Sequence, residues 1–218
     1  DAQAAGDSQA QADAQRLVAD GADKPFLDAQ FLDARNGIVV GAYNLAFMTS
    51  DGGATWQPVS RRLDNPRGLH LYTVRARRGE VVIAGEQGLL LRSNDSGQTF
   101  QRLSVPYKGS FSTVELRGAS DIVVAGLRGN VWRSVDDGAN WSQVKVPVPV
   151  SITASALDQQ GRLWLGNQAG MVLSDAGDAF VPASTGLPPL TGLLPLQDNQ
   201  VLALSIAGAA TVKLESLK

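Results

Sequence analysis

The sequence predicts an all-β fold, a β-propeller of five four-stranded blades, and three observations lead to this prediction. A segment with an Asp, a Gly two residues later and a closing aromatic residue recurs along the chain. Short apolar runs that alternate with Gly-containing turns separate the copies. Hydrophobic residues make up 44% of the 218 residues and charged residues 18%, which is enough apolar sequence for a large core.

The recurring segment occurs four times at the spacing of a propeller blade. Its copies read TSDGGATW, SNDSGQTF, SVDDGANW and LSDAGDAF, with the aspartates Asp51, Asp95, Asp136 and Asp175. Successive aspartates are 44, 41 and 39 positions apart, and a four-stranded blade takes about 40 to 45 residues. Because two apolar runs precede each copy, we expect the segment to be the turn between the third and fourth strands of a blade.

The chemistry of the segment is that of a turn. An Asp side chain accepts hydrogen bonds from the N–H groups that follow it, a Gly tolerates positive φ, and the aromatic residue packs between blades. A calcium loop instead needs five or more oxygen ligands and a closing Glu, whereas each copy supplies one or two carboxylates. We therefore expect structural turns, with no metal site and no cofactor. The residues expected to form them are Asp51, Gly53, Trp56, Asp95, Gly97, Phe100, Asp136, Gly138, Trp141, Asp175, Gly177 and Phe180.

A fifth, shorter copy ends before a fourth strand, which leaves an unpaired sheet edge. The segment AQRLV at 14–18 aligns with FQRLS at 100–104. We therefore expect a strand near residues 14–19 to pair with the last blade and close the five-bladed ring. The domain organisation expected is a flexible leader over residues 1–13 and a single propeller domain over residues 14–218.

The repeated segment resembles the Asp-box, also called the bacterial neuraminidase repeat. Its fuller context, A-G-x-x-G-x-(apolar)-x-R-S-x-D-x-G-x-x-W, resembles the photosystem II stability and assembly factor-like propeller family, over roughly residues 26–214. The resemblance implies a scaffold that docks a protein partner of an envelope or membrane complex, such as a transporter. It also implies an arginine-rich surface patch. A five-bladed ring would depart from the seven blades of the assembly factors and the six of sialidases.

The candidate binding residues lie in loops on one predicted face of the propeller. This face carries the loops between second and third strands together with the linkers between blades, and the Asp turns lie on the opposite face. Arginine pairs with carboxylates and phosphates through two parallel hydrogen bonds, so the linker arginines predict an acidic partner. Arg77 and Arg78 fall on the opposite face, which argues against one continuous patch. The candidates, each of which has ordinary solvation of a turn as its alternative, are Arg61, Arg62, Arg67, Tyr43, Asn44, Gln87, Arg128 and Gln168.

Composition excludes several classes of protein. The net charge of -2 gives no basic excess for nucleic acid, and no apolar run is long enough for insertion into a membrane. The chain has no Cys and a single His, His70, which excludes disulfides, thiol catalysis and zinc sites with several histidines. The polar first residues are typical of the region after a cleaved signal peptide, so we expect a periplasmic or secreted protein, monomeric on its own.

Two other functions follow from the same pattern. The first is binding of a small polar ligand or glycan at the mouth of the central channel. The second is glycoside hydrolysis of the sialidase kind, which needs three arginines on a carboxylate and a Tyr nucleophile activated by a Glu. Tyr72 and Glu115 are the pair to consider, but no arginine triad is apparent on three inner strands and the Arg-Ile-Pro segment of sialidases is absent. The sequence therefore predicts that the chain is not an enzyme.

Overall fold

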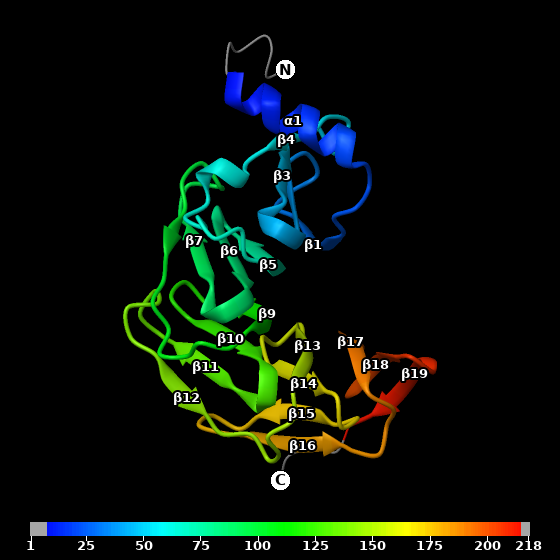
Figure 1. The fold of residues 1–218 in the computed structure, drawn as a ribbon. Helices are drawn as coiled ribbons and strands as arrows, with labels where there is room; N and C mark the ends of the chain where they lie inside the picture. Colours follow the sequence, from blue (N-terminus) through cyan, green and yellow to red (C-terminus); the bar gives the residue numbers. More distant parts are fainter. Residues whose placement is uncertain (1–7, 215–218) are drawn as a thin grey trace.

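The computed structural model describes residues 8–214, which form five antiparallel sheets arranged in an arc (Figure 1). Within each sheet the strands follow one another in chain order, so every sheet is a meander.

The first sheet contains β1 (Phe26–Phe31), β2 (Gly37–Gly41), β3 (Ala46–Thr49) and β4 (Gln57–Pro58). The second contains β5 (Leu71–Arg77), β6 (Glu80–Gly85), β7 (Leu90–Ser93) and β8 (Gln101–Arg102). The third contains β9 (Phe111–Leu116), β10 (Ile122–Gly126), β11 (Val131–Ser134) and β12 (Ser142–Val144). The fourth contains β13 (Ile152–Leu157), β14 (Leu163–Asn167), β15 (Val172–Asp175) and β16 (Phe180–Ser184). The fifth contains β17 (Leu190–Pro195), β18 (Gln200–Ser205) and β19 (Gly208–Lys213).

The core lies between consecutive sheets. The second strand of each of the first three sheets is rich in β-branched and small apolar residues, such as IVVAG in β10, because both of its faces are covered. Side chains from neighbouring sheets pack together, as Ile38 of the first sheet does with Val74 and Ile83 of the second. Such face-to-face packing holds the sheets in their order around the arc.

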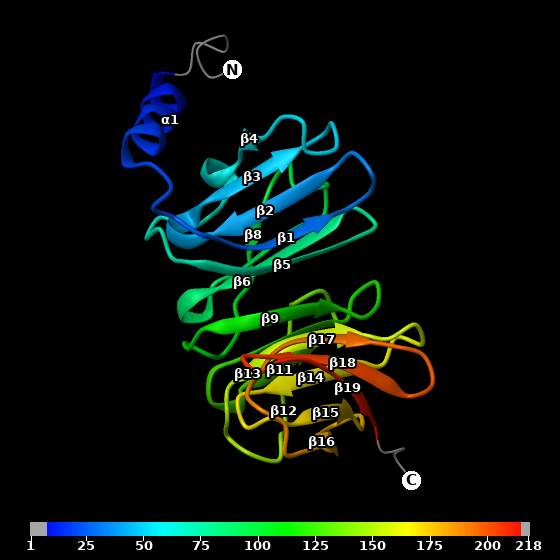
Figure 2. The same ribbon diagram turned by 90° about the vertical axis from the view of Figure 1, so that its right-hand side faces the viewer.

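The first strand of each sheet lines the concave side of the arc. β1 contacts β5, β5 contacts β9, β9 contacts β13 and β13 contacts β17. Each of these five strands has a register shift near its start, where an extra residue forms a bulge. Figures 1 and 2 show that the arc remains open between the first sheet and the fifth.

Residues 8–20 form a helix instead of the predicted strand. α1 (Ser8–Asp20) lies at one end of the arc, and the fifth sheet has three strands, so the prediction that residues 14–19 close the ring is wrong (Figure 1). In the aligned copy, Phe100 and the Asp turn before it hold the fourth strand in place. Ala14 stands at the position of Phe100, no such turn precedes it, and the Ala, Gln, Leu and Arg of this segment favour a helix.

The expected leader is only partly covered by the structure. Residues 1–7 lie outside the described residues, and residues 8–13 are the first half of α1. Within residues 8–214, no helix combines the length and apolar character needed to cross a membrane.

The two sets of loops lie on opposite faces of the arc, in agreement with the prediction. The turn after β7 contacts the hairpin between β5 and β6, where the N–H of Ser96 donates to the carbonyl of Gly79 at 2.8 Å. At the other end of the same sheet, the N–H of Glu86 donates to the carbonyl of His70, directly before β5. These two ends are called the Asp-turn face and the linker face below.

Candidate functional site

Three Asp turns share one geometry that uses the carboxylate within the turn. In the turn after β7, Asp95 accepts hydrogen bonds from the backbone N–H of Thr99 at 2.9 Å, the Thr99 hydroxyl at 2.6 Å and the Ser93 hydroxyl at 2.7 Å. The Ser93 oxygen in turn accepts the N–H of Gly97 at 2.8 Å. Asp51 and Asp136 are bonded in the same way in the turns after β3 and β11.

These hydrogen bonds favour the charged carboxylate and lower its pKa. The pKa of Asp51 falls to about 2 because it accepts from Thr55 and Thr49, and that of Asp95 falls to about 2 because it accepts from Thr99 and Ser93. Both oxygens of each carboxylate are engaged by the turn itself. Over the described range, no group of three or more His, Asp or Glu residues is placed to hold a metal ion.

The fourth turn, after β15, departs from this pattern. Asp175 follows Ser174 directly, whereas one residue separates the hydroxyl residue from the Asp in the other three copies. Asp175 accepts from the N–H of Gly177 at 2.8 Å and forms a salt bridge with Arg117 of the third sheet. The buried hydroxyl of Ser174 finds no hydrogen-bond partner among residues 8–214. Asp175 and Gly177 were expected to repeat the turn, but here the Asp links two sheets.

The linker face carries the predicted loop residues in a repeated turn. Tyr43, Gln87 and Arg128 each adopt positive φ, between 53° and 56°, in a short 3-10 turn after the second strand. Their backbone N–H groups donate to the residue that precedes the next inner strand, which is His70, Ser110 and Ser151, at 3.3–3.4 Å. These turns therefore connect neighbouring sheets. His70 has a structural role, because its ring accepts the hydrogen bond from Tyr43 directly before β5.

Two other predicted residues of this face differ in exposure. Asn44 is half-buried, donates to the carbonyl of Ser60 and accepts from Asn65, so its side chain is used within the fold. The N–H of Gln168, an exposed residue, donates to the carbonyl of Ser151 in the turn after β14. Of the two, Gln168 alone has a side chain that a partner can reach.

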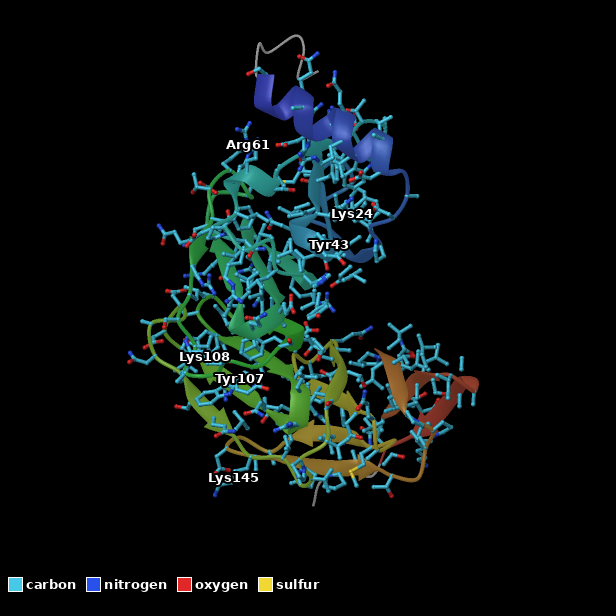
Figure 3. The ribbon with its side chains drawn as sticks, in the orientation of Figure 1. Lys24, Tyr43, Arg61, Tyr107, Lys108 and Lys145 are labelled. Atoms are coloured by element: carbon cyan, nitrogen blue, oxygen red, sulfur yellow. The ribbon has the colours of Figure 1, made fainter. Side chains whose placement is uncertain are left out.

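The structure separates the three linker arginines. Arg67 donates to the side chain of Gln87 at 2.6 Å on the linker face. Arg62 donates to the carbonyl of Gly97 in an Asp turn, on the opposite face. Arg61 lies at the outer margin of the arc near α1, well away from Tyr43 (Figure 3). Arg67 and Gln87 are thus brought together, and Arg61 and Arg62 are not part of that group.

A chain of polar contacts crosses the inner strands instead. Asp28 of β1 accepts from the hydroxyl of Thr73 and from the guanidinium of Arg75, at 2.9 and 2.8 Å. Arg75 reaches Glu115 of β9 at 3.3 Å, and Glu115 accepts from Ser155 of β13 at 2.7 Å. Burial raises the pKa of Glu115, and Arg75 and Ser155 oppose that rise. Four sheets are joined by this chain of contacts.

This chain forms one wall of a hollow on the concave side, at the Asp-turn face. The hollow, called the arginine hollow below, has a volume of about 340 Å³ and contains three arginines, Arg75, Arg77 and Arg117, with Glu115 and Asp158. They come from the ends of β5, β9 and β13. Because consecutive inner strands pack side by side, residues some 40 positions apart in the sequence meet here.

Among residues 8–214, Arg77 is the arginine of this hollow for which no ion pair is found. Arg75 is paired with Asp28 and Glu115, and Arg117 with Asp175. Within the described part of the chain, the buried Nη1 atom of Arg77 and the buried Nε atom of Arg117 have no hydrogen-bond partner. A buried guanidinium N–H without an acceptor is costly, so the hollow favours a ligand that brings carboxylate or phosphate oxygens.

The geometry opposes a sialidase reaction. Three arginines do converge, but Tyr72 stands five residues before Arg77 on the same strand, roughly 16 Å away at 3.3 Å per residue. The ring of Tyr72 stacks on His70 at 6.1 Å, whereas Glu115 is bonded to Arg75 and Ser155. Burial and the nearby Glu86 raise the pKa of Tyr72, which is the opposite of nucleophile activation.

Comparison with known proteins decides the family. The profile of the family described as "Photosynthesis system II assembly factor YCF48" matches residues 8–164, more than two thirds of the chain. The chain belongs to the YCF48 family. A relative, the photosystem II assembly lipoprotein Ycf48 of Synechococcus sp. (strain CC9902), is 37% identical over 82 residues, which are 38% of this chain and 25% of that protein. The predicted resemblance is therefore confirmed.

Solved structures show that the fold is that of YCF48. The structure of YCF48 bound to D1 peptide has a TM-score of 0.69 at 21% identity, over 84% of this chain and 60% of that one. YCF48 from Cyanidioschyzon merolae has a TM-score of 0.68 at 18% identity, over 89% and 68%. The chain thus spans about three fifths of the length of the YCF48 that was solved with a peptide.

Some structural neighbours are enzymes. The GH74 xyloglucanase from Xanthomonas campestris has a TM-score of 0.65 at 15% identity, over 84% of this chain and 34% of the enzyme, a likeness of fold alone. The family itself is one of assembly factors. The prediction that the chain is not an enzyme agrees with its family.

Sequence reasoning assigned no site to Arg77, Arg117 and Asp158, although a signal was present. The N–H of Arg117 donates to Asp121 and that of Asp158 to Arg162, so the two residues hold equivalent places before their hairpins. Aligning the third and fourth copies at this position shows a charged residue in both, whereas Leu32 and Leu196 hold the same place in the first and fifth copies.

Proposed function

We propose that this member of the YCF48 family is a non-catalytic scaffold that docks an acidic segment of a protein partner in an envelope or membrane complex, with a transporter as one class of partner. The observation that carries the proposal is the uncompensated guanidinium of Arg77 in the arginine hollow. The partner's carboxylates would pair with Arg77 and complete its hydrogen bonds. A YCF48 structure bound to the D1 peptide supports a peptide-like partner, because it has the same fold.

Several finer features belong to the same proposal. The repeated turns are Asp-boxes that serve structure alone, and the sheets are blades of a propeller. The chain works outside the cytoplasm, in the periplasm or after secretion, and is monomeric without its partner. Support for an extracytoplasmic site comes from the relative described as a lipoprotein and from the polar N-terminal sequence. Fractionation of cells that produce the protein tests this location.

The binding proposal is tested with two matched peptides. The probe is acetyl-Gly-Asp-Asp-Gly-amide, and the control replaces both Asp residues with Asn, which keeps the shape and removes the charge. We expect the acidic peptide to shift amide signals of the arginine hollow in NMR titrations and to bind more weakly as salt rises. The Asn peptide should not bind. Absence of binding by the acidic peptide at low salt would contradict the proposal.

Two variants locate the site. We expect Arg77→Gln to weaken binding of the acidic peptide by about tenfold, since one charge-assisted pair is lost. The triple variant Arg61→Gln, Arg62→Gln, Arg67→Gln removes more positive charge but lies outside the arginine hollow, so it should bind nearly as the unchanged protein does. The reverse result, loss in the triple variant alone, would place the site on the linker between the first two sheets.

A further inference from the structure

A second hollow adjoins the arginine hollow. It has a volume of about 550 Å³ and lies between the hairpin that joins β13 to β14 and the hairpin that joins β17 to β18. Asp158 and Gln159 line both hollows, so the two adjoin at this hairpin. We call the second one the glutamine hollow, because it is lined by Gln159, Gln160, Gln197 and Gln200.

The polar side chains of the glutamine hollow are available to a ligand. For the four glutamine side chains and for Asp198, no hydrogen bond or ion pair is found among the described residues. An amide side chain can both donate to a carbonyl and accept from an N–H, which are the two groups that a peptide backbone repeats at every residue. Asp198 adds a carboxylate that pairs with no cation of residues 8–214.

The wall shared by the two hollows is held in place from within. The carboxylate of Asp158 accepts from the N–H of Gln160 at 3.0 Å, the N–H of Arg162 at 2.8 Å and the indole of Trp164 at 3.1 Å. Arg162 stands over the Trp164 ring at 5.3 Å and is paired with Asp158, so its charge is compensated. The uncompensated charge of the glutamine hollow is therefore negative, and that of the arginine hollow is positive.

We propose that the two hollows form one binding groove for an extended peptide that carries an acidic residue and, about three residues away, a lysine or arginine. The acidic residue would occupy the arginine hollow, the basic residue would pair with Asp198, and the glutamines would bond the backbone between them. This inference rests on the proposed function, since it extends the same site. The spacing of three residues follows from the size of the hollows. If each hollow is treated as a sphere, touching spheres of 340 and 550 Å³ have centres about 9 Å apart, which is the length of roughly three residues of extended chain.

The test compares peptides that differ in one residue. The probes are Gly-Lys-Gly-Gly-Asp-Asp-Gly and Gly-Asp-Asp-Gly-Gly-Lys-Gly, blocked at both ends, which place the Lys on either side of the acidic pair. In the controls, Gln replaces Lys. We expect one of the two Lys peptides to bind about threefold to fivefold more tightly than its Gln control at low salt, as for one exposed ion pair. We also expect that peptide to move the indole N–H signal of Trp164, assigned with Trp164→Phe.

Two variants that each remove one negative charge test whether the preference for Lys comes from Asp198 itself or from the overall charge of the protein. Asp198→Asn should abolish the preference for Lys and leave binding of the acidic Gln peptide unchanged. Asn tolerates the positive φ of 57° at this position, so the turn should be kept. Asp64→Asn removes the same charge from an exposed linker and should retain the preference.

The outcomes distinguish this inference from the proposed function. Equal affinities of the Lys and Gln peptides in both orders, or an unmoved Trp164 signal, would overturn the groove and leave acidic binding at Arg77 intact. Loss of the preference in Asp64→Asn as well would also overturn it, because the effect would then be one of overall charge. If none of the four peptides binds, both proposals fail.

Discussion

The turns after β7 and β15 differ in length by one residue and differ in what the Asp does. In the first, Ser93 and Asp95 are separated by one residue, and both side chains bond to the turn that contains them. In the second, Ser174 and Asp175 are adjacent. The hydroxyl of Ser174 has no partner in the described part of the chain, and the Asp175 carboxylate reaches Arg117 of the preceding sheet. A single missing residue thus changes a self-contained turn into a link between sheets.

The difference also bears on the candidate site. The Asp175 carboxylate neutralises Arg117, one of the three arginines of the arginine hollow. Arg75 is also paired, so among the described residues Arg77 is the arginine of the hollow that lacks a counter-charge. In a turn of the usual length, the carboxylate would accept hydrogen bonds from residues of its own turn, as Asp95 does. The irregular copy of the repeat therefore contributes to the charge of the site, and the regular copies contribute to the stability of their own sheets.

The largest expected effect comes from breaking the link between sheets. Asp175→Ala removes the nearer counter-charge of the largely buried Arg117 and leaves it only the carboxylate of Asp121 at 4.0 Å, so we expect a loss of about 2–3 kcal/mol in the free energy of unfolding. A double-mutant cycle with Arg117→Met in urea unfolding should show strong coupling between the two positions. A cycle of Arg117→Met with Asp136→Ala, in a regular turn, should show additivity, and coupling of similar size there would contradict the comparison.

The serine pair gives the next largest difference. Ser93→Ala removes the acceptor of the Gly97 N–H and a donor to Asp95, so we expect a loss of about 1–2 kcal/mol. Ser174→Ala removes a buried hydroxyl without a partner and should be neutral or slightly stabilising. Thermal unfolding of both variants measures the difference, and equal losses would show that Ser174 is bonded in solution.

The turn glycines should differ less. Both Gly97 and Gly177 have positive φ, 83° and 100°, so alanine at either position costs about 1 kcal/mol through the backbone. A Cβ atom at Gly97 would also come within 2.8 Å of the Met48 side chain, whereas nothing lies within 4 Å of one at Gly177. We therefore expect Gly97→Ala to be the more destabilising in urea unfolding. The Met48 side chain is flexible, so Gly97→Ala in a Met48→Ala background should approach the Gly177→Ala loss.

The regular Asp turns should contribute less to the free energy of unfolding at acid pH than at neutral pH. The pKa values of Asp51 and Asp95 are lowered from 3.8 to about 2 in the folded protein. A lowered pKa means that the contribution to stability is complete above pH 4 and is lost as the pH falls from about 4 towards 2. Urea midpoints measured across this range should fall, and the fall should be smaller in Asp95→Asn. An equal fall in that variant would assign the acid sensitivity to other groups.

Local patterns predicted most elements because their stabilising contacts are close in the sequence. An Asp turn is held by hydrogen bonds that span at most four residues, so the spacing of Ser93, Asp95, Gly97 and Thr99 is enough to identify it. The same reasoning failed for residues 14–19, where AQRLV matched a strand by composition alone. A strand of two or three residues depends on its turn and its aromatic anchor, and both are missing there.

By itself, the sequence determined the repeat, the order of the strands, the two loop faces and the family resemblance, since all of these follow from periodic apolar residues and local turn chemistry. Tertiary structure alone decided which charges meet. Arg77, Arg117 and Asp158 come from three different copies of the repeat, and packing of the inner strands brings them to one hollow, where Arg117 also pairs with Asp175. An ion pair between sheets depends on the three-dimensional distance between its charged groups, and the repeat spacing alone does not fix that distance.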